Sequence, residues 1–333
     1  MDPQEGLRYR QPRRTSDPCL YHGFSLPAYG DLVGGQLDIR PVTPVIGAEI
    51  HGLDLSQPLD PDAVAAVRGA LVRHLVLFFP GQEMTPGQHA AFGRQFGELT
   101  EAHPVMPALD KDHPEVLPID SRYNKSAFWH SDVTFMATPP MGSILHAVEL
   151  PDVGGDTLWV NLQAAYDGLA SAVREFCDGL TAIHHDPVFA AEVDEAGGTV
   201  WDGKQIKRLR PVLHPVVRIH PETGRRGLFV NENFTRGILG LSRIESEGLL
   251  QMLYRHCTEV PEFSLRHRWQ PGDVAFWDNR ATLHYATDDY GDVLRVVHRV
   301  TLRGDLPYGP LGTGMEAFAQ LRPEPTPEHE TVA

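Results

Sequence analysis

Two histidines and one carboxylate are the residues of this sequence that point most directly to chemistry. His130 and Asp132 stand two positions apart, and His284 lies far downstream. Side chains at positions i and i+2 of an extended strand point to the same side, and the neighbouring Val133 and Phe135 favour such a strand. Two histidines and a carboxylate form the ligand set that holds non-haem Fe(II) and leaves the opposite coordination positions open. The spacing therefore predicts a metal site at these three residues.

Other parts of the chain have the same spacing of a histidine and a carboxylate. The three competing triplets are His184-His185-Asp186, His113-Pro114-Glu115 and His220-Pro221-Glu222. Proline directly after the first triplet disfavours a central strand there. The two His-Pro-Glu triplets are typical of turns, and the one at 220–222 of a hairpin tip. These three are weaker candidates, although spacing alone leaves an ordinary strand open for 130–132 as well.

A strand predicted at 294–302 carries two arginines on one face. Alternation places Arg295 and Arg299 on the same side and His298, a packed strand histidine, on the other. If the arginine face were solvated, it would need no further explanation. If it faced the mouth of a barrel, each buried cation would need an anion, and a planar guanidinium suits a carboxylate. Because His284 lies just upstream, we favour the inward orientation, with a dicarboxylate co-substrate and an anionic substrate as the two anions.

Composition narrows the class of protein. The 333 residues carry a formal net charge of −15, with no basic stripe to neutralise phosphates, which argues against nucleic acid as a main partner. The charge does not disfavour a small anion, which responds to its own pocket. The three scattered cysteines, Cys19, Cys177 and Cys257, predict neither a disulfide framework nor a thiolate metal site and fit a reducing cytoplasm. We expect no signal peptide and no membrane span.

The elements around the candidate residues predict an α+β fold. Helices are expected after Asp60-Pro61, after Thr85-Pro86, after Asn161 and near 245–257. Between them lie short apolar runs bounded by turns, without regular βαβ alternation, at 144–148, 157–160, 212–219, 227–230, 274–277 and 294–302. This pattern predicts a double-sheet jelly roll with helices packed outside. We expect a tail over residues 1–34, a catalytic domain over 35–310 and a second tail over 311–333.

Four segments resemble the taurine dioxygenase family of Fe(II)/2-oxoglutarate-dependent oxygenases. They are residues 129–135 (WHSDVTF), 154–160 (GGDTLWV), 214–232 (HPVVRIHPETGRRGLFVNE) and 270–299 (QPGDVAFWDNRATLHYATDDYGDVLRVVHR). The resemblance implies a double-stranded β-helix, or cupin-like, core. It implies that His130, Asp132 and His284 bind Fe(II), and that Thr157 and Arg295 hold the distal carboxylate of 2-oxoglutarate. O2 would be the second co-substrate.

The resemblance also implies a substrate site. In family members that act on sulfonates, the residue equivalent to Arg299 would grip the sulfonate with help from His103, while Val133, Phe234 and Phe189 would line the pocket. Two positions depart from the taurine-specific pattern, since Met106 and Ser126 stand where a tyrosine and an asparagine are expected. Met106 lacks a phenolic donor and favours a longer or more apolar substrate.

The activity expected from these observations is hydroxylation of a C–H bond in a small anionic molecule, either a sulfonate, an alkyl sulfate or a carboxylate. Succinate and CO2 would be the co-products. A zinc-dependent hydrolase could use the same three ligands but would not need two inward arginines. A non-catalytic jelly-roll binding protein is the other alternative, and it would tolerate loss of a metal ligand. The sequence is also compatible with a homo-oligomer.

Overall fold

The computed structural model describes residues 37–123 and 126–316 of the chain. The tail predicted for residues 1–34 lies outside the described residues, as does the predicted C-terminal tail from residue 317 onward. Around the predicted boundary at 310, two short strands pair with each other, β18 (Tyr308–Gly309) and β19 (Gly312–Thr313).

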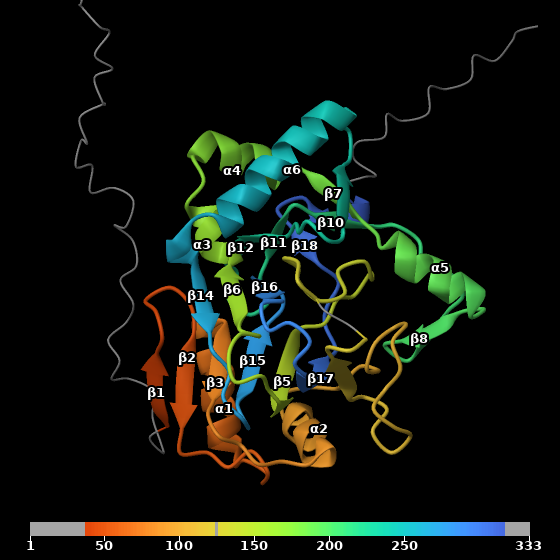
Figure 1. Ribbon diagram of the computed structural model, residues 1–333. Coiled ribbons are helices and arrows are strands. Elements are labelled where there is room, and N and C mark those ends of the chain that lie inside the picture. The colour runs from red at the N-terminus through yellow and green to blue at the C-terminus, as the bar shows by residue number, and fades with distance from the viewer. Residues whose placement is uncertain (1–36, 124–125, 317–333) are drawn as a thin grey trace, which may run out of the picture. The chain divides into compact units, whose positions relative to one another are not determined.

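A seven-stranded sheet forms the largest element of the fold (Figure 1). Its strands run in the order β1, β2, β3, β15, β5, β17 and β4, and all neighbours are antiparallel except β2 and β3. The bounds are β1 (Asp38–Pro41), β2 (Ala48–His51), β3 (Val76–Phe79), β4 (Leu117–Asp120), β5 (Gly142–Glu149), β15 (Val274–Asp278) and β17 (Val296–Leu302). Proximity in the chain does not set this order, which places β15 and β17 on either side of β5.

Four smaller antiparallel units complete the strands. One three-stranded sheet has the order β14, β6, β16, and another has the order β10, β7, β13, while β11 pairs with β12 and β8 with β9. Their bounds are β6 (Thr157–Asn161), β7 (Thr181–His184), β8 (Thr199–Trp201), β9 (Lys204–Ile206), β10 (Val212–Pro215), β11 (Val217–Ile219), β12 (Arg226–Leu228), β13 (Thr235–Ile238), β14 (Ser264–His267) and β16 (Thr282–Ala286).

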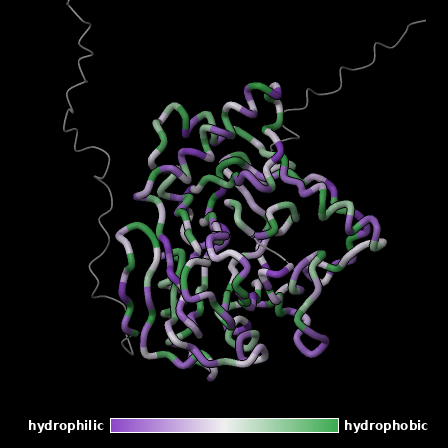
Figure 2. Tube along the Cα trace, viewed as in Figure 1, coloured by the Kyte–Doolittle hydropathy of each residue, from purple (hydrophilic) through white to green (hydrophobic). Residues whose placement is uncertain are grey.

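The two faces of the seven-stranded sheet enter different cores, as the period-two pattern of its strands requires. On one face, alternate residues such as Ile144 and Val300 pack against helices α1 (Pro61–His74) and α2 (Pro86–Arg94). On the other face, Leu145 and Val297 pack with Trp159 of the β14-β6-β16 sheet. Figure 2 shows hydrophobic and hydrophilic residues interleaved along the strands. The fold is therefore mixed, with antiparallel sheets facing each other on one side and helices covering the other.

Six helices are described, and most begin where the sequence predicts. They are α1 (Pro61–His74), α2 (Pro86–Arg94), α3 (Leu162–Asp167), α4 (Ser171–Asp178), α5 (Pro187–Glu195) and α6 (Arg243–Thr258). Asp60, Thr85 and Asn161 cap α1, α2 and α3 with their side chains, which confirms three predicted starts. The helix predicted after Asn161 is short, because α3 ends at the C-cap Gly168 and α4 begins separately at Ser171. No helix among the described residues is long and apolar enough to cross a bilayer.

The prediction of an extended strand that carries His130 and Asp132 is wrong. Only His130 forms an isolated bridge there, and the chain then turns, with Val133 in the left-handed region at φ 56°. Side chains from other elements, described below, hold this segment in place of a continuous ladder.

The competing triplets have ordinary structural roles. Asp186 caps α5 by accepting hydrogen bonds from the N–H groups of Val188 and Phe189. The sequence did not predict this helix, and the carboxylate weighed as a metal ligand is its N-cap. The triplet at 220–222 forms the tip of the β11–β12 hairpin, as predicted.

A buried ionic network joins that hairpin tip to the turn between β15 and β16. His220 Nε2 lies 2.9 Å from an oxygen of Asp278, and the guanidinium of Arg280 bonds both oxygens of the same carboxylate at 2.9 and 2.6 Å. Arg280 also reaches Glu222 at 2.7 Å. Burial alone would raise the pKa of Asp278, but Arg280 and His220 hold it well below its usual range. The network fixes the turn that precedes His284.

Buried neutral histidines make the stability of this fold sensitive to acid. Burial lowers the pKa of His74 to about 4, of His89 to about 3 and of His214 to about 4. The unfolded chain therefore binds protons at these groups below about pH 6.5 while the folded chain does not. The free energy of unfolding should fall as the pH drops from about 6.5 to about 4, by up to about 1.4 kcal/mol per pH unit for each histidine. Urea unfolding of metal-free protein at several pH values measures this slope. A shallower slope is expected for His89→Phe, and a pH-independent free energy would contradict the prediction.

Candidate active site

The three predicted ligands come together on paired backbone. The N–H of His130 donates to the carbonyl of His284 at 3.0 Å, and the N–H of His284 donates back at 2.8 Å. Their ring centroids lie 4.1 Å apart. His130 Nε2 is 3.6 Å and His284 Nε2 is 3.8 Å from Asp132 Oδ1. Within the described residues, this is the one group of three or more such side chains close enough to share a metal ion.

Side-chain bonds fasten the rest of the His-x-Asp segment to the turn that leads into β16. Ser131 Oγ donates to the carbonyl of Thr282 at 2.7 Å. The amide of Asn279 accepts from the N–H of Asp132 at 2.7 Å and donates to its carbonyl at 3.0 Å. Asn279 thus replaces a neighbouring strand for one residue, which satisfies the backbone of Asp132 without a ladder.

The carboxylate of Asp132 is held at both oxygens. Ser143 Oγ donates to Oδ2 at 2.6 Å, and Arg299 Nη1 donates to Oδ1 at 2.7 Å. Burial alone would raise the pKa of Asp132, but Arg299, with the two histidines, holds it well below its usual range. The side chain is therefore an anion, as a metal ligand must be.

The histidines also have the protonation that metal binding needs. His130 Nδ1 lies 2.9 Å from the carbonyl of Phe128, so Nδ1 carries the proton and Nε2 keeps its lone pair. Burial, followed by the proximity of His130, lowers the pKa of His284 well below its usual value. Two imidazoles and one carboxylate fit a divalent transition metal.

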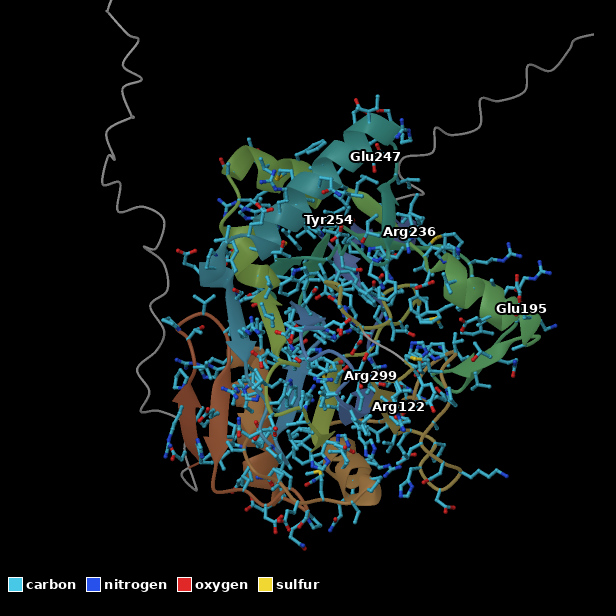
Figure 3. All side chains as sticks on the ribbon, in the orientation of Figure 1. Arg122, Glu195, Arg236, Glu247, Tyr254 and Arg299 are labelled. Carbon is cyan, nitrogen blue, oxygen red and sulfur yellow. The ribbon has the colours of Figure 1, made fainter. Side chains whose placement is uncertain are left out.

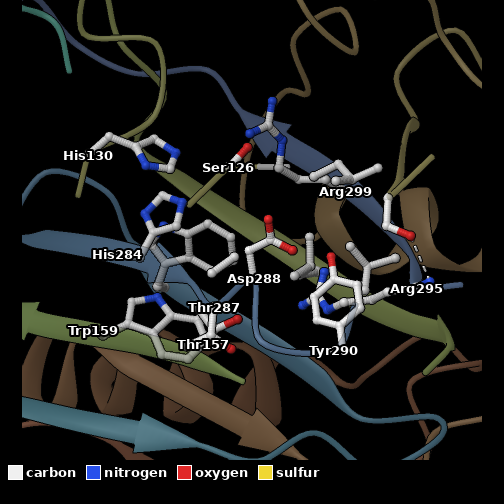
Figure 4. Close-up of a pocket in the computed structure, with 16 residues that line it drawn as sticks. Ser126, His130, Thr157, Trp159, His284, Thr287, Asp288, Tyr290, Arg295 and Arg299 are labelled. Carbon is white, nitrogen blue, oxygen red and sulfur yellow. Dashed lines mark hydrogen bonds between the residues drawn. The ribbon is translucent and has the colours of Figure 1, made fainter. Parts of the chain in front are cut away.

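A pocket extends from these residues toward Arg295 (Figure 4). Figure 4 shows His130 and His284 on one side and Arg295 with Tyr290 on the other. The pocket is lined by residues of several strands and of the loop after β16: Ile119, Ser121, Ser126, His130, Leu145, Thr157, Trp159, Trp277, His284, Ala286, Thr287, Asp288, Tyr290, Arg295, Val297 and Arg299. Both predicted arginines thus face one cavity, which confirms the inward orientation of that strand face.

Both guanidiniums are buried and incompletely paired. Arg295 is 5% exposed and Arg299 is 6% exposed. Arg295 Nε donates to the carbonyl of Gly155 at 3.0 Å, but its Nη2 has no hydrogen-bond partner among the described residues. Arg299 likewise leaves Nε and Nη2 unsatisfied. Burial lowers the pKa of Arg295. Buried cations with free donors favour anionic ligands.

Thr157 lies in the same pocket, at the start of β6. Its Oγ1 accepts from the indole N–H of Trp269 at 2.9 Å. Because an indole nitrogen only donates, the hydroxyl proton of Thr157 stays available for another acceptor.

The predicted substrate residues form a largely aromatic group beside the triad. Phe234 packs with Phe135 at 5.0 Å and with His130 at 6.2 Å between ring centroids. Phe189 lies 5.0 Å from the His103 ring. Val133 belongs to the same cluster as Phe234, and Phe189 packs against that cluster.

The polar face of this group is defined by His103. Its Nδ1 accepts from the main-chain N–H of Val105 and of Met106, each at 3.1 Å, so the proton sits on Nε2. Burial, then the charge of Arg299, lowers the pKa of His103 to about 3. His103 is therefore a neutral donor. Ser126 lines the pocket, whereas Met106 is tied to His103 through its main chain.

Sequence reasoning missed the residues that support the ligands. Ser143 bonds the side chain of Asp132, and Asn279 bonds its backbone. Ser143 lies on β5, next to strand β17, which carries Arg299 (Figure 3). A serine inside an apolar strand gives no signal in a single sequence. Asn279 stands in a Trp-Asp-Asn-Arg run before His284, and its position at a turn was the available clue.

Comparison with known proteins agrees with this geometry. Residues 38–301 match the family model described as "Taurine catabolism dioxygenase TauD, TfdA family". The chain belongs to the TauD/TfdA family. It is 42% identical over 284 residues to an alpha-ketoglutarate-dependent sulfate ester dioxygenase of Pseudomonas putida, covering 82% of this chain and 92% of the relative.

Two further relatives support membership of the TauD/TfdA family. An alkylsulfatase of Acinetobacter baylyi is 39% identical over 288 residues, with 83% of this chain and 88% of the relative covered. The crystal structure of a putative alpha-ketoglutarate-dependent taurine dioxygenase from Burkholderia xenovorans superposes with a TM-score of 0.73 at 44% identity, covering 84% and 93% of the two chains. This TauD/TfdA protein is therefore an alpha-ketoglutarate-dependent dioxygenase, and the hydrolase and binding-protein alternatives are not supported.

Ser143→Ala should weaken metal binding while leaving the fold intact. The substitution removes the hydroxyl that fixes Asp132 Oδ2, and loss of such an outer partner typically costs about 10- to 100-fold in metal affinity. Competition with a chelating dye measures the affinity for Fe(II) or Mn(II). Ser264→Ala, a surface substitution on β14, serves as the control. Equal affinity in Ser143→Ala and the parent protein would show that Asp132 does not depend on this bond.

Proposed function

We propose that this protein is an Fe(II)- and 2-oxoglutarate-dependent dioxygenase that oxidises the carbon bearing the anionic group of a sulfate ester or a longer-chain sulfonate. The observation that carries the proposal is one pocket lined by His130 and His284, the two histidines of the His-Asp-His group, and by two buried arginines that keep unpaired N–H donors. A single site of this kind can take a metal and two different anions.

Iron would be held by His130, Asp132 and His284. Their ligand atoms lie within 4.8 Å of one another, His284 is neutral and the aspartate is ionised, so the donor set fits Fe(II). Bound iron would supply the oxidising chemistry, in which O2 and 2-oxoglutarate are consumed and succinate and CO2 are formed. The protein supplies position and electrostatics.

Arg295 and Thr157 would bind the distal carboxylate of 2-oxoglutarate. Arg295 offers an unpaired Nη2, and Thr157 offers a hydroxyl proton from the opposite sheet. Charge-assisted bonds to a carboxylate would satisfy both groups in a site that water leaves on binding. The pocket extends from Arg295 to His130 and His284. A 2-oxoglutarate molecule held at Arg295 by its distal carboxylate would therefore direct its keto acid end toward the triad.

Arg299 and His103 would bind the anionic head of the primary substrate. Arg299 keeps Nε and Nη2 free while its Nη1 bonds Asp132, so it can hold an anion next to the metal ligand. The neutral His103 would donate from Nε2. Val133, Phe234 and Phe189 would surround the apolar body, and Ser126 would lie at the pocket wall.

The relatives and the aromatic wall together favour a sulfate ester as substrate. Oxidation of R–CH2–OSO3⁻ with one O2 and one 2-oxoglutarate would give a hemiacetal-like sulfate that collapses to R–CHO and sulfate, with succinate and CO2 as co-products. One oxygen atom of O2 enters succinate, and the other enters the substrate carbon. Met106 and Ser126 provide no phenol or carboxamide for an amino group, so taurine would be a poor substrate.

The fold supports a double-stranded β-helix as the core of this site. The seven-stranded sheet and the β14-β6-β16 sheet share the buried cluster that contains Trp159, Trp277 and Val297. His284 and Thr157 come from the smaller sheet, while Arg299 comes from the larger one. We infer that the catalytic domain spans about residues 35–310.

The two arginines should separate in function. Arg295→Ala should raise the KM for 2-oxoglutarate by at least about tenfold, because the distal carboxylate of 2-oxoglutarate loses a bidentate partner. Arg299→Ala should instead raise the KM for the primary substrate and lower the ratio of product to succinate. Steady-state assays at saturating Fe(II) measure both effects, and saturation is needed because Arg299 also bonds Asp132. Identical effects on both ligands would refute this division.

Chain length should decide the preferred substrate. In a panel of taurine, alkanesulfonates and alkyl sulfates, substrate-dependent succinate formation should increase from taurine to longer apolar bodies. An apolar pocket gains about 1–3 kcal/mol per added methylene at most, which corresponds to about 10- to 200-fold in kcat/KM. The measurement is kcat/KM for each compound at fixed 2-oxoglutarate. A clear preference for taurine that falls as the chain lengthens would overturn the assignment.

A further inference from the structure

The turn directly after the metal-binding carboxylate has a conformation that its own sequence does not favour. Val133 is buried, β-branched and non-glycine, yet it lies in the left-handed region at φ 56°. Such residues persist only where their surroundings over-determine them. The turn is closed by a bond from the N–H of Met136 to the carbonyl of Val133 at 3.0 Å. This turn carries Val133 and Phe135 into the apolar wall beside the triad.

His214 holds the two carbonyls that follow the strained residue. Its Nε2 lies 3.0 Å from the carbonyl of Thr134 and 3.1 Å from that of Met136. Carbonyl oxygens only accept, so Nε2 carries the proton and donates to both. His214 is fully buried on β10, and burial keeps it neutral. One imidazole therefore clamps the turn from outside the metal site.

The side chain of Thr134 is fixed by His184 of β7 and by Asn231 of the loop between β12 and β13. Its Oγ1 lies 3.0 Å from Asn231 Nδ2 and 3.0 Å from His184 Nδ1. The Oδ1 atom of the same Asn231 accepts from the N–H of Phe234 at 2.8 Å. Asn231 thus connects the turn after Asp132 to the opposite aromatic wall of the pocket.

His184 closes the network at its far end. Its Nε2 lies 3.3 Å from the hydroxyl of Thr235, which accepts from the N–H of Asn231 at 3.0 Å. His184 is completely buried and stacks on Phe229 with ring centroids 5.9 Å apart. The histidine that the sequence offered as a competing metal ligand is therefore part of this hydrogen-bonded network.

We propose that His214, Asn231 and His184 are positioning residues that set where the reacting carbon of the substrate lies relative to the metal. The proposal rests on the function proposed above. The network fixes Phe135 and Phe234, whose rings pack at 5.0 Å, against the backbone that carries Asp132. Without it, the turn relaxes from its left-handed conformation, and both walls move relative to the metal. Displacement of a substrate by about 1 Å can cost on the order of a hundredfold in rate.

Three variants test the network, and a fourth serves as the control. Thr134→Val keeps the shape of the side chain and removes the hydroxyl that Asn231 and His184 contact. His214→Met removes the clamping donor, whereas His214→Gln offers an amide nitrogen that can reach the same carbonyls. His89→Met is the matched control, because His89 is also a fully buried histidine but lies on α2, against the other face of the seven-stranded sheet.

The first measurement is coupling with hexyl sulfate as the probe. Sulfate released per succinate formed should fall at least about twofold in Thr134→Val and His214→Met, and the KM for hexyl sulfate should rise about tenfold. The KM for 2-oxoglutarate should stay within about twofold of the parent value, since Arg295 is untouched. His214→Gln should recover much of the coupling, and His89→Met should lose thermal stability while keeping full coupling.

The second measurement does not depend on turnover. Calorimetric titration of hexyl sulfate into protein loaded with Mn(II) and 2-oxoglutarate should show about tenfold weaker binding in Thr134→Val and His214→Met, and unchanged binding in His89→Met. Unchanged affinity and coupling in the first two variants, with lower melting temperatures alone, would overturn the inference and leave the network a purely structural role. A parent protein that forms no succinate from 2-oxoglutarate and Fe(II) with any sulfonate or sulfate would instead overturn the proposed function.

Discussion

The reciprocal main-chain bonds between His130 and His284 are the interaction on which the candidate site depends. They bring together two ligands from distant parts of the chain without a continuous strand, because the following residues turn away. Ser131 and the amide of Asn279 then extend the attachment residue by residue toward Asp132. The metal ligands are thus positioned by one local backbone junction, and the turn that supplies Asn279 is itself fixed by the buried ions around Asp278.

Desolvation is the second constraint. Alternation along β17 sends Val300 to the helical core and Arg299 to the space between the sheets. Arg295 precedes the strand at a register shift and reaches the same cavity. Buried guanidiniums with unsatisfied donors are costly unless anions complete them. The sheet packing therefore leaves two buried guanidiniums with unpaired donors in one cavity, which is the basis for proposing that the pocket binds two small anions.

Much of this arrangement could be predicted from the sequence, and the failures have physical causes. Short apolar runs between turns located many of the strands, and capping residues located the starts of α1, α2 and α3. Alternation placed Arg295 and Arg299 on one face, and the position of His284 just upstream favoured the inward orientation. The strand predicted around His130 does not form, because side chains such as Asn279 satisfy backbone groups that a ladder would otherwise pair. The contact of Ser143 with Asp132 depends on sheet order, which local patterns do not encode. Asp186 was considered as a ligand because it follows His184 at the spacing that separates Asp132 from His130, and spacing alone does not distinguish a helix cap from a ligand.

The bond between Arg299 Nη1 and Asp132 Oδ1 has a thermodynamic consequence. Asp132 Oδ1 lies near both histidines and also bonds the arginine, so a metal dication bound there would share one negative charge with the guanidinium. An anion that bound Arg299 would weaken its bond to Asp132 and would leave more of the carboxylate charge available to a metal ion. By reciprocity, the occupancy of either subsite alters the free energy of filling the other by the same amount. In the proposed site, metal and organic anion would then be heterotropic effectors of each other within a single cavity, and this one shared carboxylate would carry the coupling.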